Sequence, residues 1–140
     1  MKILFLCTGN ACRSQLAEGW SRRLKKDRIE PYSAGVSPHG FVDPRILRVM
    51  AEAGIDISDQ RSKHVSELEG IEFDYVVTLC DNARKNCPPF PAGTVVLHVG
   101  FDAPPVLAAG AKTEEEALVH YRRIRDEIGA FVETLPVALA

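Results

Sequence analysis

The amino-acid sequence predicts a doubly wound α/β domain, with a parallel sheet of about four strands flanked by helices. Short apolar runs, typical of buried strands, alternate along the chain with longer segments of helical periodicity. The chain has 140 residues, of which 46% are hydrophobic and 26% are charged, as in an ordinary globular domain. We therefore expect a single domain over residues 1–140 whose core needs no disulfide or metal.

The first expected strand is the apolar run at residues 2–6, which ends at a turn containing glycine. A helix follows over residues 15–25, where Leu16, Trp20 and Leu24 recur at intervals of four. The chain therefore opens with a strand, a loop and a helix.

A short second strand is expected at residues 32–34, and a second helix after it. Asp43 is a suitable N-cap, because Pro44 then occupies the first helical position, and Gly54 marks the end of the helix. The predicted apolar face of this helix consists of Ile46, Leu47, Met50 and Ala51.

The second half of the chain predicts two buried strands and a long terminal helix. The strands are expected at residues 73–79 and 94–99, after a short helix at residues 66–69. Between the two strands we expect a loop with two cysteines. Thr113 and Glu116 have the spacing of a capping box, which starts the terminal helix. The apolar side of that helix is formed by Leu118, Tyr121, Ile124, Ile128, Phe131, Val132 and Leu135.

Charge and cysteine content limit the partners and the compartment. A formal net charge of −2 gives no basic field for nucleic acid or a membrane surface, although a local anion site is compatible with it. No segment approaches the roughly 18 continuous apolar residues of a membrane span, and the apolar N-terminal run is too short for a secretion signal. We expect a monomer in the cytoplasm, whose four cysteines remain thiols with a catalytic or redox role.

Three reactive side chains follow expected strands. Cys7, Cys80 and Asp102 each come just after one of them. Ligands of doubly wound folds bind beyond the carboxyl ends of the strands, so these three side chains can share one site.

The segment from Cys7 to Ser14 carries the strongest motif, a cysteine and an arginine separated by five residues between a strand and a helix. Backbone amides of such a loop can point at an oxyanion, Gly9 permits the required backbone angles, and Arg13 can hold two oxygens. These surroundings favour a thiolate, and Ser14 could donate a hydrogen bond to it while Asn10 braces the loop. The alternative is a buried cysteine beside a solvated arginine. The candidate oxyanion-binding residues are Thr8, Gly9, Asn10, Ala11, Cys12, Arg13 and Ser14.

The chain resembles the low-molecular-weight tyrosine phosphatases and, among them, the thioredoxin-coupled arsenate reductases. Gln15 matches the reductases, because phosphatases usually have proline at this position. The matching segments are Cys7–Gln15, Ala17–Trp20, Tyr32–Gly35, Val76–Cys80 and Gly100–Asp102. The resemblance covers almost the whole chain, and it implies the phosphatase fold and a thiol chemistry that needs no cofactor.

The resemblance also implies a relay of three cysteines that reduces arsenate to arsenite. Cys7 attacks arsenate, Cys80 attacks Cys7 and releases arsenite, and Cys87 attacks Cys80. The resulting disulfide between Cys80 and Cys87 would be reduced by thioredoxin. Without this relay, Cys80 is a core residue at a strand end and Cys87 an incidental loop thiol.

Asp102 and Cys12 differ in what the resemblance implies. Asp102 is expected to act as general acid toward the oxygen that leaves arsenic or phosphorus. Its loop departs from the family pattern, in which a proline closely follows this aspartate, because Ala103 stands before Pro104 here. Cys12 has no step in the relay and is expected to be a packed, mostly inert thiol.

Two other functions use the same loop. A low-molecular-weight protein-tyrosine phosphatase would need only Cys7, Arg13 and Asp102. A redox sensor or anion-binding protein would hold an oxyanion without turnover. Arsenate, phosphate and sulfate are similar oxyanions that should compete for the loop, so electron flow separates reductase from phosphatase. The sequence leaves open whether thioredoxin or glutaredoxin with glutathione supplies the electrons.

No metal site is expected, since the four histidines (His39, His64, His98 and His120) have no zinc-like spacing with the cysteines. Some related reductases hold a potassium ion with side chains that match Asn10, Glu18 and Ser33. A fourth ligand of that ion, an aspartate, aligns with Lys63, whose ammonium could occupy the same place and exclude the ion. The alternative is that Lys63 points into water.

Overall fold

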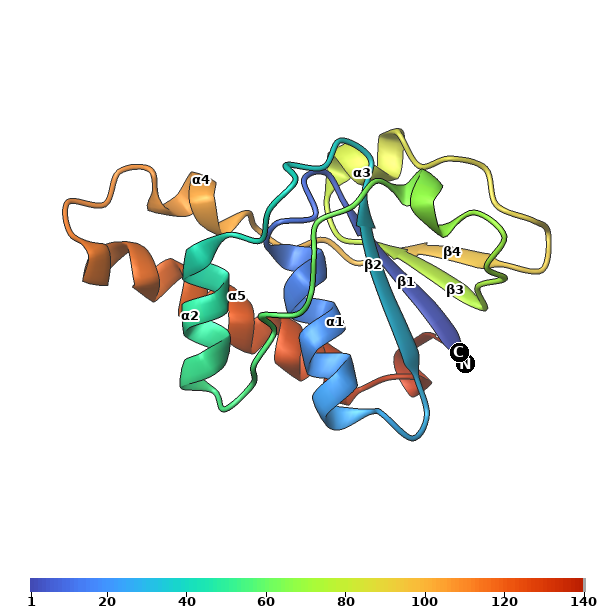
Figure 1. Ribbon diagram of the computed structural model, residues 1–140, viewed down its shortest axis with the longest axis horizontal. Helices are drawn as coiled ribbons and strands as arrows, with labels where there is room; N and C mark the ends of the chain where they lie inside the picture. The colour runs from blue at the N-terminus through green and yellow to red at the C-terminus, as the bar shows by residue number, and fades with distance from the viewer. Residues whose placement is uncertain (140) are drawn as a thin grey trace.

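Four parallel strands form the sheet of the molecule, for which a computed structural model describes residues 1–139. The sheet has the order β2-β1-β3-β4, and every neighbouring pair is parallel (Figure 1). The strands are β1 (Lys2–Cys7), β2 (Glu30–Gly35), β3 (Tyr75–Thr78) and β4 (Val95–His98). This architecture confirms the predicted fold class.

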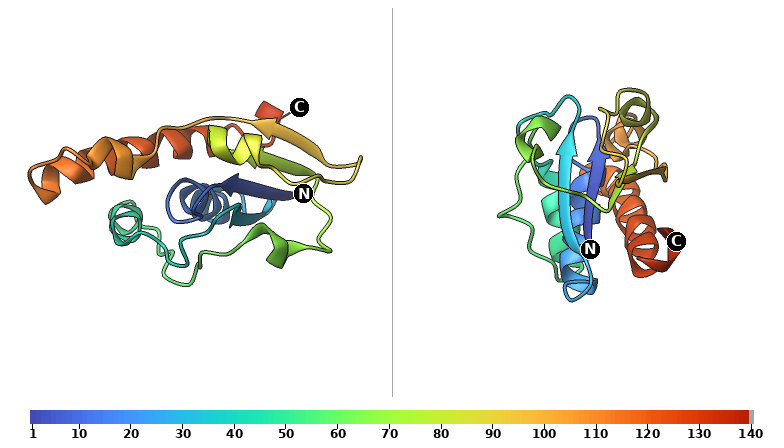
Figure 2. Two further views of the ribbon diagram at one scale, coloured as in Figure 1. Left: turned by 90° about the horizontal axis from the view of Figure 1, so that it is seen from above. Right: turned by 90° about the vertical axis from the view of Figure 1, so that its right-hand side faces the viewer.

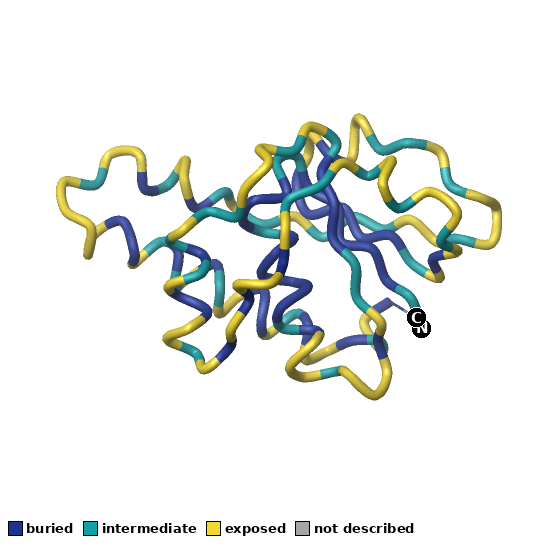
Figure 3. The backbone as a smooth tube through the Cα atoms, in the orientation of Figure 1, coloured by how far each residue is buried: buried dark blue, intermediate teal, exposed yellow. Residues whose placement is uncertain are grey.

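The central strand β1 carries the most deeply buried part of the sheet, because it lies between β2 and β3. Residues 3–6 of this strand are 0% exposed, whereas Val95 and Val96 on the edge strand β4 are 46% and 45% exposed. Figure 3 shows the same contrast, with buried residues along the inner strands and exposed residues in the outer loops. Cys7 is the last residue of β1, so a deeply buried strand places this thiol at the carboxyl end of the sheet.

Three helices pack against one another beside the sheet, and α1 lies closest to β1 and β2. They are α1 (Arg13–Leu24), α2 (Pro44–Glu52) and α5 (Glu114–Glu133). The longest, α5, projects beyond the sheet at its N-terminal end (Figure 2). No helix within residues 1–139 is long and apolar enough to span a bilayer.

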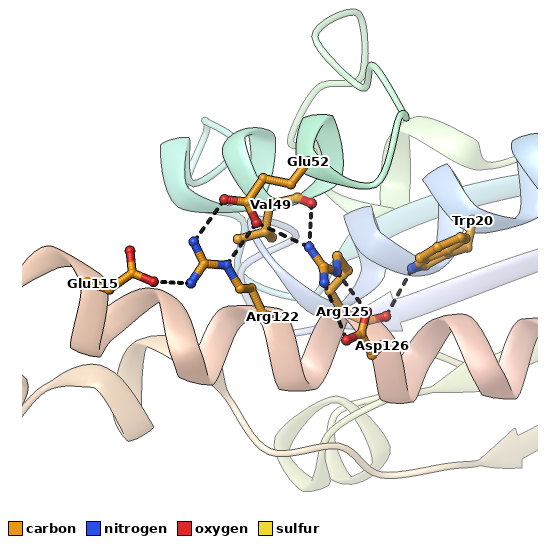
Figure 4. A network of polar contacts seen from close by, with 7 residues as sticks. All are labelled: Trp20, Val49, Glu52, Glu115, Arg122, Arg125 and Asp126. Atoms are coloured by element: carbon orange, nitrogen blue, oxygen red, sulfur yellow. Dashed lines mark hydrogen bonds and ion pairs between the residues drawn. The ribbon is translucent and has the colours of Figure 1, made fainter.

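A network of polar contacts joins α2 to α5 and α1 (Figure 4). Arg125 of α5 donates to the Val49 carbonyl of α2 at 2.9 Å, and Trp20 of α1 donates to the Arg125 carbonyl at 3.0 Å. Arg122 pairs with Glu52 at 2.9 Å. The last turn of α2 is therefore held by guanidinium groups of the terminal helix.

Most expected helix boundaries agree with the structure. The Asp43 side chain caps α2 by accepting from the Arg45 amide at 2.9 Å, and Thr113 caps α5 by accepting from the Glu116 amide at 3.1 Å. The predicted apolar face of α2 is partly wrong, because Ala51 is exposed while Val49 is buried.

The prediction of a plain loop after β3 is also wrong. This segment contains the helix α3 (Asp81–Lys85), and α4 (Pro104–Ala108) follows β4 where no helix was expected. Both helices have five residues, too few to show a helical period in the sequence. The 3₁₀ turns η1 (Val65–Leu68) and η2 (Val137–Leu139) complete the described chain.

Candidate active site

The loop between β1 and α1 has a conformation that its neighbours hold in place. Asn10 has a φ of +48°, which side chains other than glycine rarely adopt, and it is fully buried. Its Oδ1 accepts from the Lys63 amide at 2.9 Å and its Nδ2 donates to Ser14 Oγ at 2.7 Å. The structure thus places Asn10 as a brace, with the backbone amide of Lys63 as its partner.

A second brace comes from the segment just before Lys63. The Gln15 side chain donates to the Asn10 carbonyl at 3.0 Å and to the Arg61 carbonyl at 3.1 Å. Gln60 in turn donates to Gln15 Oε1 at 2.9 Å, and both glutamine side chains are buried. Residues 60–63 therefore fix the loop from outside, a role that no motif in the sequence signals.

Cys7 lies at the base of the loop and is 3% exposed. Its Sγ is 2.9 Å from Ser14 Oγ. Because Ser14 Oγ accepts from the Asn10 amide group, its own proton is free to point at the sulfur. This arrangement allows Ser14 to donate a hydrogen bond to the Cys7 sulfur.

In front of Cys7 lies a cavity of about 210 Å³. The loop and its Arg13 line this cavity, as an oxyanion site requires. The Arg13 guanidinium is oriented by a hydrogen bond from Nη1 to the Phe101 carbonyl at 2.9 Å. The lining residues are Cys7, Thr8, Gly9, Ala11, Cys12, Arg13, His39, Ala103, Pro105 and Val106.

Cys80 lies beside this loop, at the start of α3. Its Sγ is 3.3 Å from Thr8 Oγ1 and accepts from the Ala83 amide at 3.4 Å. Asn82 also donates to Thr8 Oγ1 at 2.9 Å. The loop hydroxyl of Thr8 thus joins the second thiol to the loop that carries the first.

Cys87 is separated from Cys80 by α3. It is partly buried, and this burial raises the pKa of its thiol above the ordinary value. All four cysteines are free thiols in this structure. A bond between Cys80 and Cys87 is therefore absent here, and the segment between them is helical.

Asp102 lies next to the cavity but does not line it. Together with Arg13 and Cys80, it lines an adjoining hollow of about 390 Å³. Its carboxylate is 3.4 Å from the Arg123 guanidinium. The structure thus places Asp102 in a hollow that it shares with Arg13, and outside the lining of the Cys7 cavity.

Comparison with known proteins identifies the family. The sequence profile described as "Low molecular weight phosphotyrosine protein phosphatase" matches residues 2–104. The chain belongs to this family. It is also 46% identical over 132 residues to an arsenate reductase of Halalkalibacterium halodurans, covering 94% of this chain and 92% of the relative. An arsenate reductase of Bacillus subtilis is 46% identical over 127 residues, covering 91% and 88% of the two chains.

Solved structures similar to this chain include arsenate reductases and a protein tyrosine phosphatase. A crystal structure of an arsenate reductase from Archaeoglobus fulgidus has a TM-score of 0.73 and 29% identity, with 95% of this chain and 97% of that chain covered. A low molecular weight protein tyrosine phosphatase from T. tengcongensis has a TM-score of 0.76 and 26% identity, with 99% of each chain covered. The family fold therefore carries both chemistries, and side chains must separate them.

Cys12 shares the phosphatase-family loop with Cys7 but differs in its surroundings. Its Sγ is 3.5 Å from Asp43 Oδ2, which also accepts from the Tyr121 hydroxyl at 2.7 Å. Burial first, and then the Asp43 charge, raise the pKa of Cys12 well above its ordinary value. Cys12 therefore stays a protonated thiol, and the sequence had indicated Asp43 only as a helix cap.

Lys63 does not extend into solvent. Its Nζ donates to the Ser33 and Arg61 carbonyls, both at 2.9 Å. Ser33 Oγ donates to Glu18 Oε1 at 2.5 Å, so the ammonium and a buried carboxylate lie on either side of Ser33. Burial lowers the pKa of Lys63, while the charge of Glu18 acts in the opposite direction.

Proposed function

We propose that the chain is an arsenate reductase in which Cys7, Cys80 and Cys87 pass two electrons to arsenate. The observation that carries this proposal is the contact of Cys80 with Thr8, because it brings a second thiol to the loop of the nucleophile. A phosphatase has no use for that thiol. The curated relatives named arsenate reductase support the same assignment.

The first step is an attack of the Cys7 thiolate on arsenic. Backbone amides of residues 8–14 and the Arg13 guanidinium neutralise the oxyanion, and an arsenic oxygen leaves as water after protonation. Asp102 is the proposed proton donor, and the hollow that it lines together with Arg13 and Cys80 supports this role. A covalent bond between Cys7 Sγ and arsenic results.

The second step transfers the electrons. The Cys80 thiolate attacks Cys7 Sγ, and the sulfur–arsenic bond breaks so that arsenic keeps the electron pair and leaves as arsenite. Cys87 then attacks Cys80, which frees Cys7 and forms the disulfide between Cys80 and Cys87. The helix α3 has to rearrange for this step, since it separates the two thiols in the reduced protein.

A dithiol protein must reduce that disulfide for another turnover, and we propose thioredoxin in the cytoplasm as this partner. Phosphate and sulfate should compete with arsenate for the loop. The protein acts as a single-domain monomer that needs neither a cofactor nor a metal.

The test is arsenate-dependent consumption of NADPH in the presence of thioredoxin and thioredoxin reductase. We expect turnover with this pair and much less with glutathione plus glutaredoxin. Absence of arsenate-dependent turnover with either donor would contradict the assignment and would favour the phosphatase alternative, which needs only Cys7, Arg13 and Asp102.

A further inference from the structure

Residues 36–39 run beside the anion loop and are bonded to it. The backbone amides of Val36, Ser37 and His39 donate to the carbonyls of residues 7–9 over 2.9 to 3.1 Å, which continues the pairing of β2 with β1 beyond the sheet. Ser62 adds a bridge, because its hydroxyl donates to the Gly9 carbonyl at 3.1 Å and accepts from the Gly40 amide at the same distance. The turn after β2 is therefore fixed against the loop at both of its ends.

This turn places the His39 ring directly over Gly9. A Cβ atom at Gly9 would lie 2.6 Å from His39 Nε2 and 2.8 Å from the two adjacent ring carbons. Real side-chain atoms do not approach so closely, so the imidazole occupies the space that a side chain at position 9 would need. The ring itself is exposed and makes no hydrogen bond to any residue that the structure describes.

His39 also lines the cavity that contains Cys7 and Arg13. The other lining residues outside the anion loop, Ala103, Pro105 and Val106, are apolar. His39 is therefore the one side chain outside the anion loop that lines the described cavity and can form hydrogen bonds there. Asp102 does not belong to the lining of this cavity.

The direction in which the leaving group departs determines what the His39 ring contacts during the reaction. In a displacement the leaving oxygen stands in line with the attacking atom and on the opposite side of the centre. Cys7 is 3% exposed, whereas His39, Pro105 and Val106 of the same lining are exposed, so the leaving oxygen points toward these three residues. A bare oxyanion presents a hydroxyl or an oxide there, whereas a phosphate ester presents its organic group.

We propose that His39 is a specificity-determining residue of the Cys7 cavity. Its ring binds the outward oxygen of a bare oxyanion and occupies the space into which the organic group of a phosphate ester would extend. This inference rests on the proposed function. It adds the residue that makes the anion loop favour inorganic oxyanions over phosphate esters, although the loop can bind either.

The test compares His39→Ala with a matched control, Phe41→Ala. Phe41 is 58% exposed, its ring centroid is 6.1 Å from that of His39, and it does not line the cavity. Two readouts need neither arsenate nor a reductant, namely the Kd of inorganic phosphate by calorimetry and kcat/KM for p-nitrophenyl phosphate hydrolysis. They remain informative even if arsenate reduction itself fails.

We expect His39→Ala to weaken phosphate binding about tenfold and to raise the kcat/KM of ester hydrolysis about tenfold. The control should change neither value more than about twofold. His39→Gln, which keeps a hydrogen-bond donor, should retain most of the phosphate affinity. A parallel fall of both values in His39→Ala would show a merely structural role and overturn the proposal, and so would no change in either.

Discussion

The sulfur of Cys7 has a single hydroxyl neighbour, Ser14, whose proton is free because Asn10 donates to the same oxygen. Cys7→Ser should abolish arsenate reduction and phosphate-ester hydrolysis together, since an alcohol is a far weaker nucleophile than a thiolate at neutral pH. Both activities can be measured on one preparation whose thermal unfolding matches the parent. Retention of either activity would place the nucleophile elsewhere.

Cys80 and Cys87 should affect only the electron transfer. We expect Cys80→Ser and Cys87→Ser to stop multiple-turnover reduction while p-nitrophenyl phosphate hydrolysis continues, because hydrolysis needs only Cys7, Arg13 and Asp102. Steady-state assays of both reactions check this. An equal loss of the two activities in a folded variant would contradict the relay.

Asp102 is exposed and paired with Arg123 at 3.4 Å. If it is the general acid, Asp102→Asn should slow the chemical step by about 10²–10⁴-fold with little loss of phosphate affinity. Single-turnover kinetics and calorimetry separate these two effects. Arg123→Gln is the control, because it removes the ion pair but keeps the acid. An unchanged rate in Asp102→Asn would exclude the general-acid role.

The sequence predicted the residues of this site better than their supports. The spacing of Cys7 and Arg13 forms a compact motif, and Cys80 follows directly after an expected strand. Such reactive side chains at such positions can be recognised in a sequence. Gln60 could not be found in this way, because its contact with Gln15 joins segments that are 45 residues apart. A polar residue in an irregular loop carries no local sign of a distant partner.

Among the elements, α2 is joined to both the anion loop and α5 through Asp43. Its carboxylate caps α2 and accepts from Tyr121, and Cys12 lies 3.5 Å away. Asp43→Ala should lower the free energy of unfolding by about 1–3 kcal/mol, because a helix cap is lost and a buried hydroxyl loses its partner.

The same variant should also make Cys12 more reactive, since Asp43 contributes to the raised pKa of that thiol. Iodoacetamide labelling at pH 8, followed by mass spectrometry, should modify Cys12 in Asp43→Ala but not in the parent protein. Asp56→Ala is a suitable control, because Asp56 also accepts a local backbone hydrogen bond, from the Ser58 amide at 2.9 Å. Rapid labelling of Cys12 in the parent would contradict the prediction.

The long helices α2 and α5 were predictable because their periodicity and their caps, Asp43 and Thr113, can be recognised from neighbouring residues of the sequence. The helices α3 and α4 were not, since each has only five residues. Their signals are a cysteine N-cap and a Pro-Pro pair, which also occur in plain loops. The missed helix α3 matters most, because it separates Cys80 from Cys87 and must rearrange before these two thiols can form a disulfide.

For the molecule as a whole, Lys63 joins β2, the anion loop and the segment at residues 60–63. Its ammonium donates to the Ser33 and Arg61 carbonyls, so a potassium ion at the same place would meet a like charge. We predict that the melting temperature and the arsenate affinity differ little between potassium and sodium chloride at fixed ionic strength.

Thermal melts in each salt check this prediction, with Lys63→Asp as the test variant. Potassium-specific stabilisation should appear in Lys63→Asp only. Lys112→Asp makes the same charge change at an exposed position and should show none. Strong potassium-specific stabilisation of the parent protein would contradict the prediction.

The anion loop is held by segments that are far apart in the chain, at residues 36–39, 60–63 and 80–82. An oxyanion can therefore bind only to the completely folded chain, and its binding energy is added to the global stability. Phosphate at 100 times its Kd should raise the free energy of unfolding by about 2.7 kcal/mol. The protein would then resist proteolysis in proportion to the oxyanion supply of its surroundings, even when no arsenate is present.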